Sequence, residues 1–259
     1  MSEQVQPTNT EVKSSPEVVV KAHQRVHVCC ILDTSGSMRP FSKGTLTAVN
    51  TLIENQQKDQ KQLTLEVGLA EDKPVMKFSA CYFALDRQPF LSAVPIEDVK
   101  PIDKYECEGT TALTDAIAET IADLESKVEK DEKVLLYIFT DGQENASRKH
   151  KTEDVRKLVK RKQEEGWEVT FLGANQDASE EGGKYSIPTT SCINFEQSHT
   201  GISEVFENIN MHMSYSKRGV SSSISVGSKR SREDDDSWVK VLSHDITAAD
   251  GRSSKKMRV

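Results

Sequence analysis

The chain has 259 residues and a formal net charge of −7, and hydrophobic residues make up 36% of it. That share is below the roughly 45–50% of a globular domain, so we expect part of the chain not to pack into a core. The polar excess lies in residues 1–21 and in the serine-rich residues 214–259. We predict these to be disordered flanks of a folded domain that spans residues 22–213.

Residues 214–259 and the rest of the chain differ in the sign of their net charge. Residues 214–259 carry ten Lys or Arg and six Asp or Glu, a net of +4, and subtraction from the totals of 34 and 41 leaves −11 on the rest of the chain. An acidic body argues against binding of a nucleic-acid backbone by the folded domain. The basic tail is therefore the part expected to contact nucleic acid, if any part does.

The sequence offers no signal for export or for membrane insertion. It begins without the basic stretch and apolar core of a secretory signal, and no apolar run approaches the roughly 18 residues of a membrane span. The cysteines are odd in number and lack metal-binding spacing, so we interpret them as reduced thiols. They are Cys29, Cys30, Cys81, Cys107 and Cys192. We expect a soluble intracellular protein, cytoplasmic or nuclear, that is not secreted and contacts no membrane.

In chain order, the apolar pattern predicts strands that alternate with helices. Residues 26–32 are typical of a strand buried on both faces, and residues 45–58 place apolar side chains at helical spacing. Residues 63–99 predict two or three strands, beginning with LTLEVGLA, in an order that the pattern leaves open. The remaining predicted elements are a helix over 112–128, a strand over 133–140, a helix over 152–166, a strand over 167–174, a short helix over 176–185, an edge strand over 192–195 and a helix over 202–213.

This alternation predicts the α/β class, with three layers and a mainly parallel central sheet flanked by helices. Ligands bind such sheets beyond the carboxyl ends of the strands. Two polar segments begin at strand ends, DTSGSM at residue 33 and Asp141-Gly142, and a third, GTTAL at residue 109, leads into the helix over 112–128. Their carboxylate and hydroxyl oxygens suit Mg²⁺, Mn²⁺ or Ca²⁺ rather than Zn²⁺ or copper.

The segment DTSGSM resembles the Asp-x-Ser-x-Ser motif of von Willebrand factor A domains. The segments GTTALTDAI, YIFTDGQENASR and WEVTFLGANQDA are similar to stand-alone A domains of bacteria and their phages. The resemblance covers residues 25–212 and implies a Rossmann-like three-layer fold with a metal-ion-dependent adhesion site. The ligands that it implies are Asp33, Ser35, Ser37, Thr111 and Asp141, with Thr110 as an alternative to Thr111.

Two carboxylates leave a bound divalent ion neutral in formal charge and about one of its six coordination positions open. The resemblance implies that an Asp or Glu carboxylate of a protein partner fills this position, so we expect a non-enzymatic interaction module. A Mg²⁺-dependent hydrolase is the alternative, although the sequence has no Gly-x-Ser-x-Gly, phosphate-binding glycine motif or His-Glu-x-x-His. Taken alone, DTSGS also suits a turn that caps a helix.

The tail contains two short basic clusters of the composition found in nuclear import signals. They are Lys229, Arg230 and Arg232, followed by Lys255, Lys256 and Arg258. A solvated charged tail explains the same residues equally well. A further interpretation makes the protein a scaffold, whose tail contacts nucleic acid while the domain recruits a partner.

Overall fold

The computed structural model describes residues 23–67, 75–174 and 177–220. Six strands form one sheet in the order β3-β2-β1-β4-β5-β6, in which all neighbours are parallel except β2 and β3. The strands are β1 (Arg25–Asp33), β2 (Met76–Phe83), β3 (Arg87–Pro95), β4 (Glu132–Thr140), β5 (Glu168–Ala174) and β6 (Cys192–Phe195). The mainly parallel sheet predicted from the sequence is confirmed.

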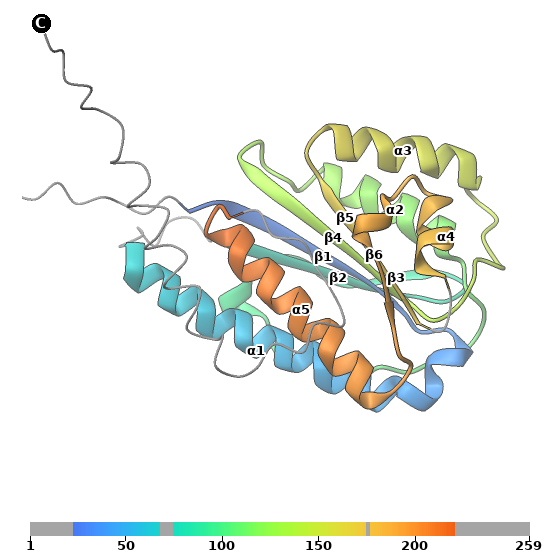
Figure 1. Ribbon diagram of the computed structural model, residues 1–259, viewed down its shortest axis with the longest axis horizontal. Helices are drawn as coiled ribbons and strands as arrows, with labels where there is room; N and C mark the ends of the chain where they lie inside the picture. Colours follow the sequence, from blue (N-terminus) through green and yellow to red (C-terminus); the bar gives the residue numbers. More distant parts are fainter. Residues whose placement is uncertain (1–22, 68–74, 175–176, 221–259) are drawn as a thin grey trace, which may run out of the picture. The chain divides into compact units, whose positions relative to one another are not determined.

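The described residues also form five α-helices, which complete the three predicted layers. They are α1 (Ser42–Val67), α2 (Leu113–Glu125), α3 (Thr152–Glu164), α4 (Ala178–Gly183) and α5 (His199–Lys217). Helices α1 and α5 lie on one face of the sheet, and α2, α3 and α4 lie on the other (Figure 1). Strand β1 is buried along its whole length because helices cover both of its faces.

Helix α1 is longer than the sequence predicted. We expected it to end at residue 58 and a strand to begin at residue 63, but the helix continues to Val67. The pattern was misread because Gln56 and Gln60 occupy the buried face, where the sequence analysis looked for apolar residues. Gln56 donates hydrogen bonds to the backbone and side-chain oxygens of Asn210 at 2.9 and 2.7 Å. Leu63, which is 2% exposed, continues that face.

Among the described residues, two strands, β2 and β3, lie between α1 and α2. They form an antiparallel hairpin around residues 84–86, with β2 beside β1 and β3 at the edge of the sheet. The register of this hairpin shifts near Ala80, and Ala93 of β3, whose backbone N–H donates to the hydroxyl of Ser79, has a positive φ of 53°. A short reversal of this kind leaves no helical segment between the strands, which is why the strand order was not evident from the pattern.

The C-terminal helix also differs from the predicted range 202–213. Helix α5 begins at His199, where the side chain of Ser198 caps it by accepting a hydrogen bond from the backbone N–H of Gly201 at 3.0 Å. It ends at Lys217, whose carbonyl accepts a hydrogen bond of 2.9 Å from the backbone N–H of Gln24. The beginning and the end of the folded unit therefore meet at the amino-terminal end of β1.

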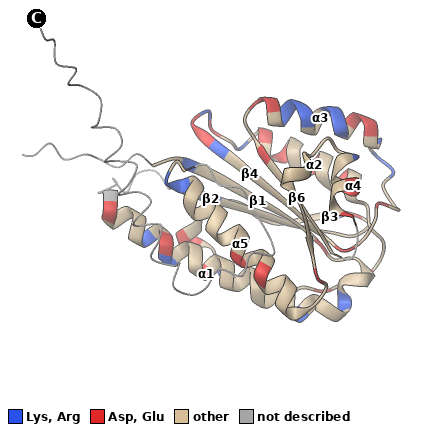
Figure 2. Cartoon of the chain, viewed as in Figure 1, with Lys and Arg blue, Asp and Glu red and all other residues tan. Residues whose placement is uncertain are grey.

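Helix α3 has the charged, amphipathic character that the sequence predicted (Figure 2). Val155 and Val159 are buried one turn apart, and the other face carries both Lys or Arg and Asp or Glu side chains. The chain leaves the helix through Gly166, whose φ of +95° is in the left-handed region that glycine adopts without strain. Gly166 therefore acts as the predicted C-terminal stop.

All five cysteines are free thiols, four of them buried, as the sequence analysis expected. No helix within the described ranges is both long and apolar enough to cross a membrane. The predicted flank 1–21, the predicted tail from residue 221 onward and the two basic clusters, from Lys229 to Arg232 and from Lys255 to Arg258, lie outside the described residues. The predicted start of the disordered tail at residue 214 was wrong, because α5 continues to Lys217. Residues 214–220 are described, and most of them continue α5.

Helix α5 is anchored to α1 by a buried ion pair. The ammonium group of Lys217 is fully buried and lies 2.5 Å from the carboxylate of Asp59, which Arg218 also contacts at 2.7 Å. Burial lowers the pKa of Lys217, whereas the two basic groups outweigh the effect of burial on Asp59 and lower its pKa. The charged forms of Asp59 and Lys217 are therefore stabilised by their oppositely charged partners.

We expect Asp59→Ala to lower the free energy of unfolding by about 3–5 kcal/mol, because it leaves a buried ammonium group without its carboxylate. Adding Lys217→Met should restore most of the loss, since no buried unpaired lysine then remains. Urea unfolding of both variants checks this. A double variant no more stable than Asp59→Ala alone would contradict the role given to the pair.

Candidate metal centre

The candidate site begins with a buried carboxylate at the end of β1. Asp33 has no exposed surface. Its Oδ1 accepts a hydrogen bond from the backbone N–H of Ser35 at 2.7 Å, and its Oδ2 accepts one from the hydroxyl of Thr140 at 2.6 Å. Burial raises the pKa of Asp33 to about 6, although these hydrogen bonds counteract the shift. The tyrosine hydroxyl of Tyr105 donates to the backbone carbonyl of Asp33 and holds the strand end in place.

The second carboxylate, that of Asp141, follows β4 and is linked to the first loop through two serines. The hydroxyls of Ser35 and Ser37 lie 3.1 Å apart, and Ser37 donates to Oδ1 of Asp141 at 2.6 Å. Oδ2 of Asp141 accepts a hydrogen bond from the amide of Gln197, in the loop before α5. Burial raises the pKa of Asp141 as well. The structure thus joins Ser35, Ser37 and Asp141 in one chain of contacts beside Asp33.

The third predicted loop, residues 108–112, is hydrogen-bonded to the first. The backbone N–H of Glu108 donates to the carbonyl of Thr34 at 2.8 Å, and that of Gly36 donates to the carbonyl of Gly109 at 3.1 Å. These contacts place the loop at the carboxyl edge of the sheet, where the two aspartates lie. All three loops predicted to form the site therefore meet.

Within this loop, Thr111 and not Thr110 faces the site. Thr111 is 3% exposed, and a Cβ atom added to Gly142 would lie 3.0 Å from its hydroxyl oxygen. Thr110 is exposed. The Thr111 hydroxyl therefore packs closely against Gly142, and a larger residue beside Asp141 would have to displace it by a few tenths of an ångström.

The loop after β4 is clamped to the start of α2. The carboxylate of Glu144 accepts hydrogen bonds from the backbone N–H groups of Thr114, Ala146 and Ser147 at 2.6–2.9 Å, and from the hydroxyl of Ser147 at 2.6 Å. Asn145 forms a reciprocal pair with the backbone of Thr111, with both hydrogen bonds at 3.0 Å. These hydrogen bonds therefore fix the position of the loop that carries Asp141 relative to the loop that carries Thr111.

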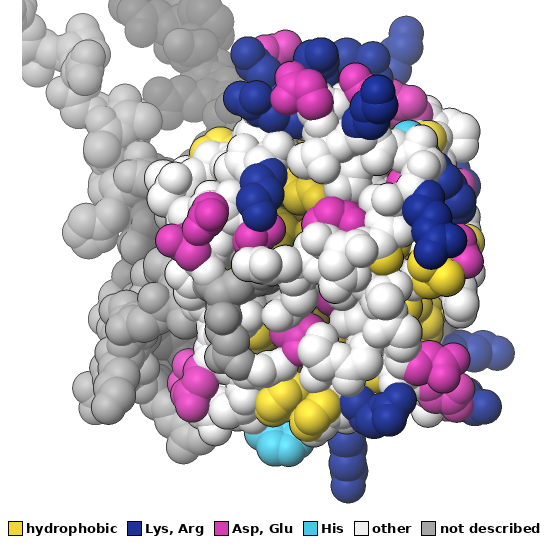
Figure 3. Space-filling model, turned by 90° about the vertical axis from the view of Figure 1, so that its right-hand side faces the viewer, with side chains coloured by type: hydrophobic (Ala, Val, Ile, Leu, Met, Phe, Trp, Pro, Cys, Tyr) yellow, Lys and Arg dark blue, Asp and Glu magenta, His cyan; other side chains and the backbone are white. Residues whose placement is uncertain are grey.

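Three residues of the site were missed by the sequence analysis: Thr140, Tyr105 and Gln197. Thr140 had a detectable signal, since it is the last residue of a predicted strand and directly precedes Asp141. Tyr105 and Gln197 had none, because they lie in irregular segments that only the tertiary fold brings to the two aspartates. Figure 3 shows this end of the molecule, where Asp and Glu side chains lie near the middle of the view and most Lys and Arg side chains lie toward its margin.

The chemistry of these residues fits a hard divalent cation. Two carboxylates and three hydroxyls converge here, all of them oxygen donors of the kind that Mg²⁺, Mn²⁺ and Ca²⁺ prefer. No group of three or more His, Cys, Asp or Glu side chains that could hold a metal occurs in the described residues, so this site depends on its hydroxyls. Among the described residues, no Lys, Arg or His is a cause of the pKa shift of Asp33 or of Asp141, and burial raises the pKa of both.

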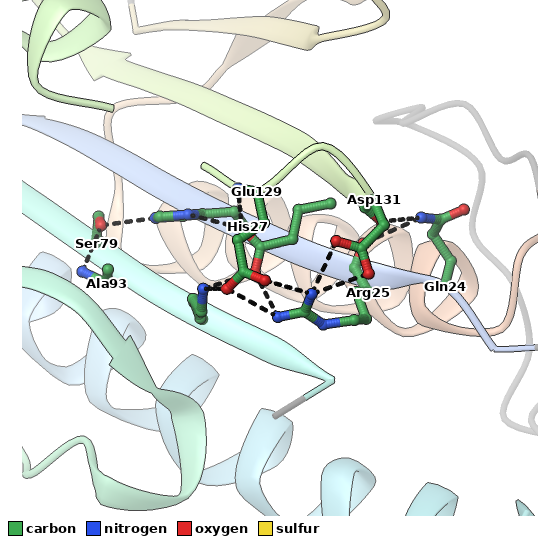
Figure 4. A network of polar contacts seen from close by, with 9 residues as sticks. Gln24, Arg25, His27, Ser79, Ala93, Glu129 and Asp131 are labelled. Carbon is green, nitrogen blue, oxygen red and sulfur yellow. Dashed lines mark hydrogen bonds and ion pairs between the residues drawn. The ribbon is translucent and has the colours of Figure 1, made fainter. Parts of the chain in front are cut away.

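The opposite edge of the sheet provides a contrast (Figure 4). There, Arg25 contacts Glu129, Asp131 and Glu132 at 2.9–3.0 Å, and Lys77 contacts Glu132 at 2.9 Å. Hydrogen bonds from these bases lower the pKa of Glu129 to about 2. Carboxylates that are already paired with bases attract a metal ion weakly, so the carboxyl edge is the better candidate for a cation.

The fold and this oxygen-rich cluster define an open-sheet α/β domain with a candidate cation site at its carboxyl edge. The model of the von Willebrand factor type A domain matches residues 27–210. The chain therefore belongs to the von Willebrand factor type A domain family, whose members are often metal-dependent interaction modules. No curated protein matches the chain in sequence.

Two solved structures share the fold of this chain at low sequence identity. Proximal thread matrix protein 1 from the mussel byssus, solved with a zinc-occupied MIDAS motif, has a TM-score of 0.52 and 16% identity, with coverage of 76% of this chain and 47% of its own. The pilus adhesin SpaC from Lactobacillus rhamnosus GG has a TM-score of 0.57 and 11% identity, with coverage of 75% and 30%. The chain spans less than half the length of either protein, and the likeness shows the fold alone.

We expect Glu144→Gln to lower the free energy of unfolding at neutral pH by about 1–2 kcal/mol, because a neutral amide accepts these hydrogen bonds more weakly than a carboxylate. Although burial opposes it, the hydrogen bonds hold the pKa of Glu144 below its ordinary 4.5. The stabilisation is thus fully present above pH 4.5 and is lost as the pH falls through the folded-state pKa. Urea unfolding across this range should show the two proteins converging in acid; a constant difference would contradict the assignment.

Proposed function

We propose that the domain is a non-enzymatic protein-interaction module that binds an acidic group of a partner through a divalent metal ion. The observation that carries the proposal is the convergence of Asp33, Ser35, Ser37 and Asp141 in one cluster, with Thr111 beside it. Family membership supports it, since von Willebrand factor A domains are often metal-dependent interaction modules.

In this proposal, hydroxyl oxygens of Ser35, Ser37 and Thr111 hold the ion, and Asp33 and Asp141 contribute the negative charge. Two carboxylates balance the charge of a divalent ion without excess, so the cluster retains affinity for one more anionic ligand. The bound ion supplies the attraction for that ligand, an Asp or Glu carboxylate of the partner. The hydrogen bonds from Thr140 and Ser35 keep the Asp33 carboxylate in a fixed orientation.

We propose Mg²⁺ as the ion, with Mn²⁺ and Ca²⁺ as alternatives, because all the donors are hard oxygens. The zinc-occupied motif of the mussel protein shows that a site in this fold can also hold zinc. Competition between Mg²⁺, Mn²⁺, Ca²⁺ and Zn²⁺ for the purified protein therefore belongs in the test of this assignment.

We further propose that the protein acts inside the cell. Its five cysteines are free, and Cys29, Cys30 and Cys81 are fully buried, which suits a reducing compartment. Their pKa values are raised by burial, so these thiols are unreactive packing groups.

We expect Mg²⁺ to raise the melting temperature of the wild-type domain and not that of Asp33→Asn. The pKa of Asp33 rises from its ordinary 3.8 to about 6, so in the metal-free protein its ionisation at neutral pH costs about 3 kcal/mol of stability. Because this cost is absent below pH 3.8 and complete above pH 6, the metal-free Asp33→Asn domain should melt no lower than wild type at neutral pH. Equal Mg²⁺ shifts in the two proteins would exclude Asp33 from the metal site.

Affinity capture with wild-type protein and Asp33→Ala, in millimolar Mg²⁺ and in EDTA, tests the interaction itself. Partners of the site should be captured only by the wild type in Mg²⁺, because both changes remove the ion. Asp154→Ala is the matched control, since Asp154 is an exposed aspartate on α3 and is not one of the five candidate ligands. A partner set that survives both EDTA and Asp33→Ala would contradict the proposal, as would Mg²⁺-dependent turnover of phosphoester or peptide substrates.

A further inference from the structure

Arg39 lies beside the candidate metal site in a constrained position. It belongs to the 3-10 turn η1 (Gly36–Phe41), two residues after Ser37, and is exposed. Its Nε donates a hydrogen bond of 3.1 Å to the backbone carbonyl of Cys107, in the segment that leads into the third loop of the site. The guanidinium group is thus hydrogen-bonded to the protein through its Nε atom.

The two terminal nitrogens of the guanidinium group are available to a ligand. Within the described ranges, neither terminal nitrogen of Arg39 has a hydrogen-bond or ion-pair partner. A guanidinium presents its N–H donors in a planar array that matches a carboxylate. Because Nε is already held, binding such a ligand costs less side-chain entropy than for a freely rotating arginine.

Arg39, Asp33 and Asp141 all lie near the segment 107–109. The segment 107–109 is held against the first loop by the hydrogen bonds from Glu108 to Thr34 and from Gly36 to Gly109. The thiol of Cys107 lies close enough to respond to both kinds of charge: burial, Asp33 and Asp141 raise its pKa and Arg39 lowers it, with a net rise to about 11. The guanidinium group therefore lies within electrostatic reach of the cluster that holds the proposed ion.

We propose that Arg39 is a specificity-determining residue that binds a second carboxylate of the same partner. The recognised ligand is then an acidic peptide segment with two carboxylates, one for the ion and one for Arg39. This inference rests on the proposed function. Glu106 and Glu108 flank Cys107 and are exposed, and Lys104 pairs with Glu106 at 3.6 Å, so Arg39 is the base left to offset their repulsion of a second acid.

Lys43 provides a matched control for the contact. It lies one helical turn beyond Arg39, at the start of α1, and is also exposed, but its side chain is not anchored to any group among the described residues. A general electrostatic attraction would weaken similarly when either base is removed. A specific contact would weaken only when Arg39 is removed.

The test uses the full chain and fluorescein-labelled peptides of glycine and serine that carry two glutamates separated by zero to three residues. The matched peptides have the second glutamate replaced by glutamine. In millimolar Mg²⁺, wild-type protein should bind the best two-glutamate peptide at least about fivefold more tightly than its glutamine counterpart. Arg39→Gln should abolish this preference, and Arg39→Lys should keep only part of it.

Further measurements separate a specific contact of Arg39 from a general electrostatic attraction. Lys43→Gln should retain the preference, and Mn²⁺ titration by calorimetry should give the same metal affinity for wild type and Arg39→Gln. Equal binding of both peptide types by wild type, or an unchanged preference in Arg39→Gln, would overturn the assignment of Arg39 and leave the proposed function standing. Peptide binding that ignores EDTA would overturn the proposed function and this inference together.

Discussion

The buried carboxylate of Asp33 is the feature on which the candidate site depends. Strand β1 lies in the middle of the sheet, so the side chain at its carboxyl end is removed from water and its ionised form is destabilised. Hydrogen bonds from Thr140 and Ser35 fix its two oxygens without supplying a positive charge. A divalent ion at this edge would provide the missing charge, which joins the stability of the domain to the proposed binding function.

Most of the fold could be predicted because its strands and helices have distinct apolar periods. The central strands β1 and β4 read as apolar runs since both faces are buried, and α2 shows a regular apolar face. Helix α1 was cut short because Gln56 and Gln60 lie on its buried face, where apolar residues were expected; the amide of Gln56 donates hydrogen bonds to Asn210. The hairpin of β2 and β3 was left unordered because a short turn, unlike a helix, does not fix the pairing.

The three polar segments could be found in the sequence because two follow strand ends and one precedes a helix, and the resemblance to von Willebrand factor A domains then named the five candidate ligands. Their surroundings could not. Tyr105 and Gln197 reach the aspartates from segments with no periodic pattern, and the reciprocal pair of Asn145 and Thr111 exists only once both loops are folded. Sequence patterns record which residues sit on which element, whereas the orientation of a ligand is set by hydrogen bonds between elements far apart in the chain.

The most direct test of the account is to add Mn²⁺ to isotopically labelled protein and record the paramagnetic broadening of its backbone amide signals. A metal site at the carboxyl edge predicts broadening that is centred on residues 33–37, 109–112 and 141–142, is displaced by Mg²⁺ and is absent in Asp33→Ala. The ion-paired cluster at residues 129–132, at the opposite edge of the sheet, should keep sharp signals. Broadening centred on that cluster or on the tail, or no broadening at stoichiometric Mn²⁺, would contradict the account.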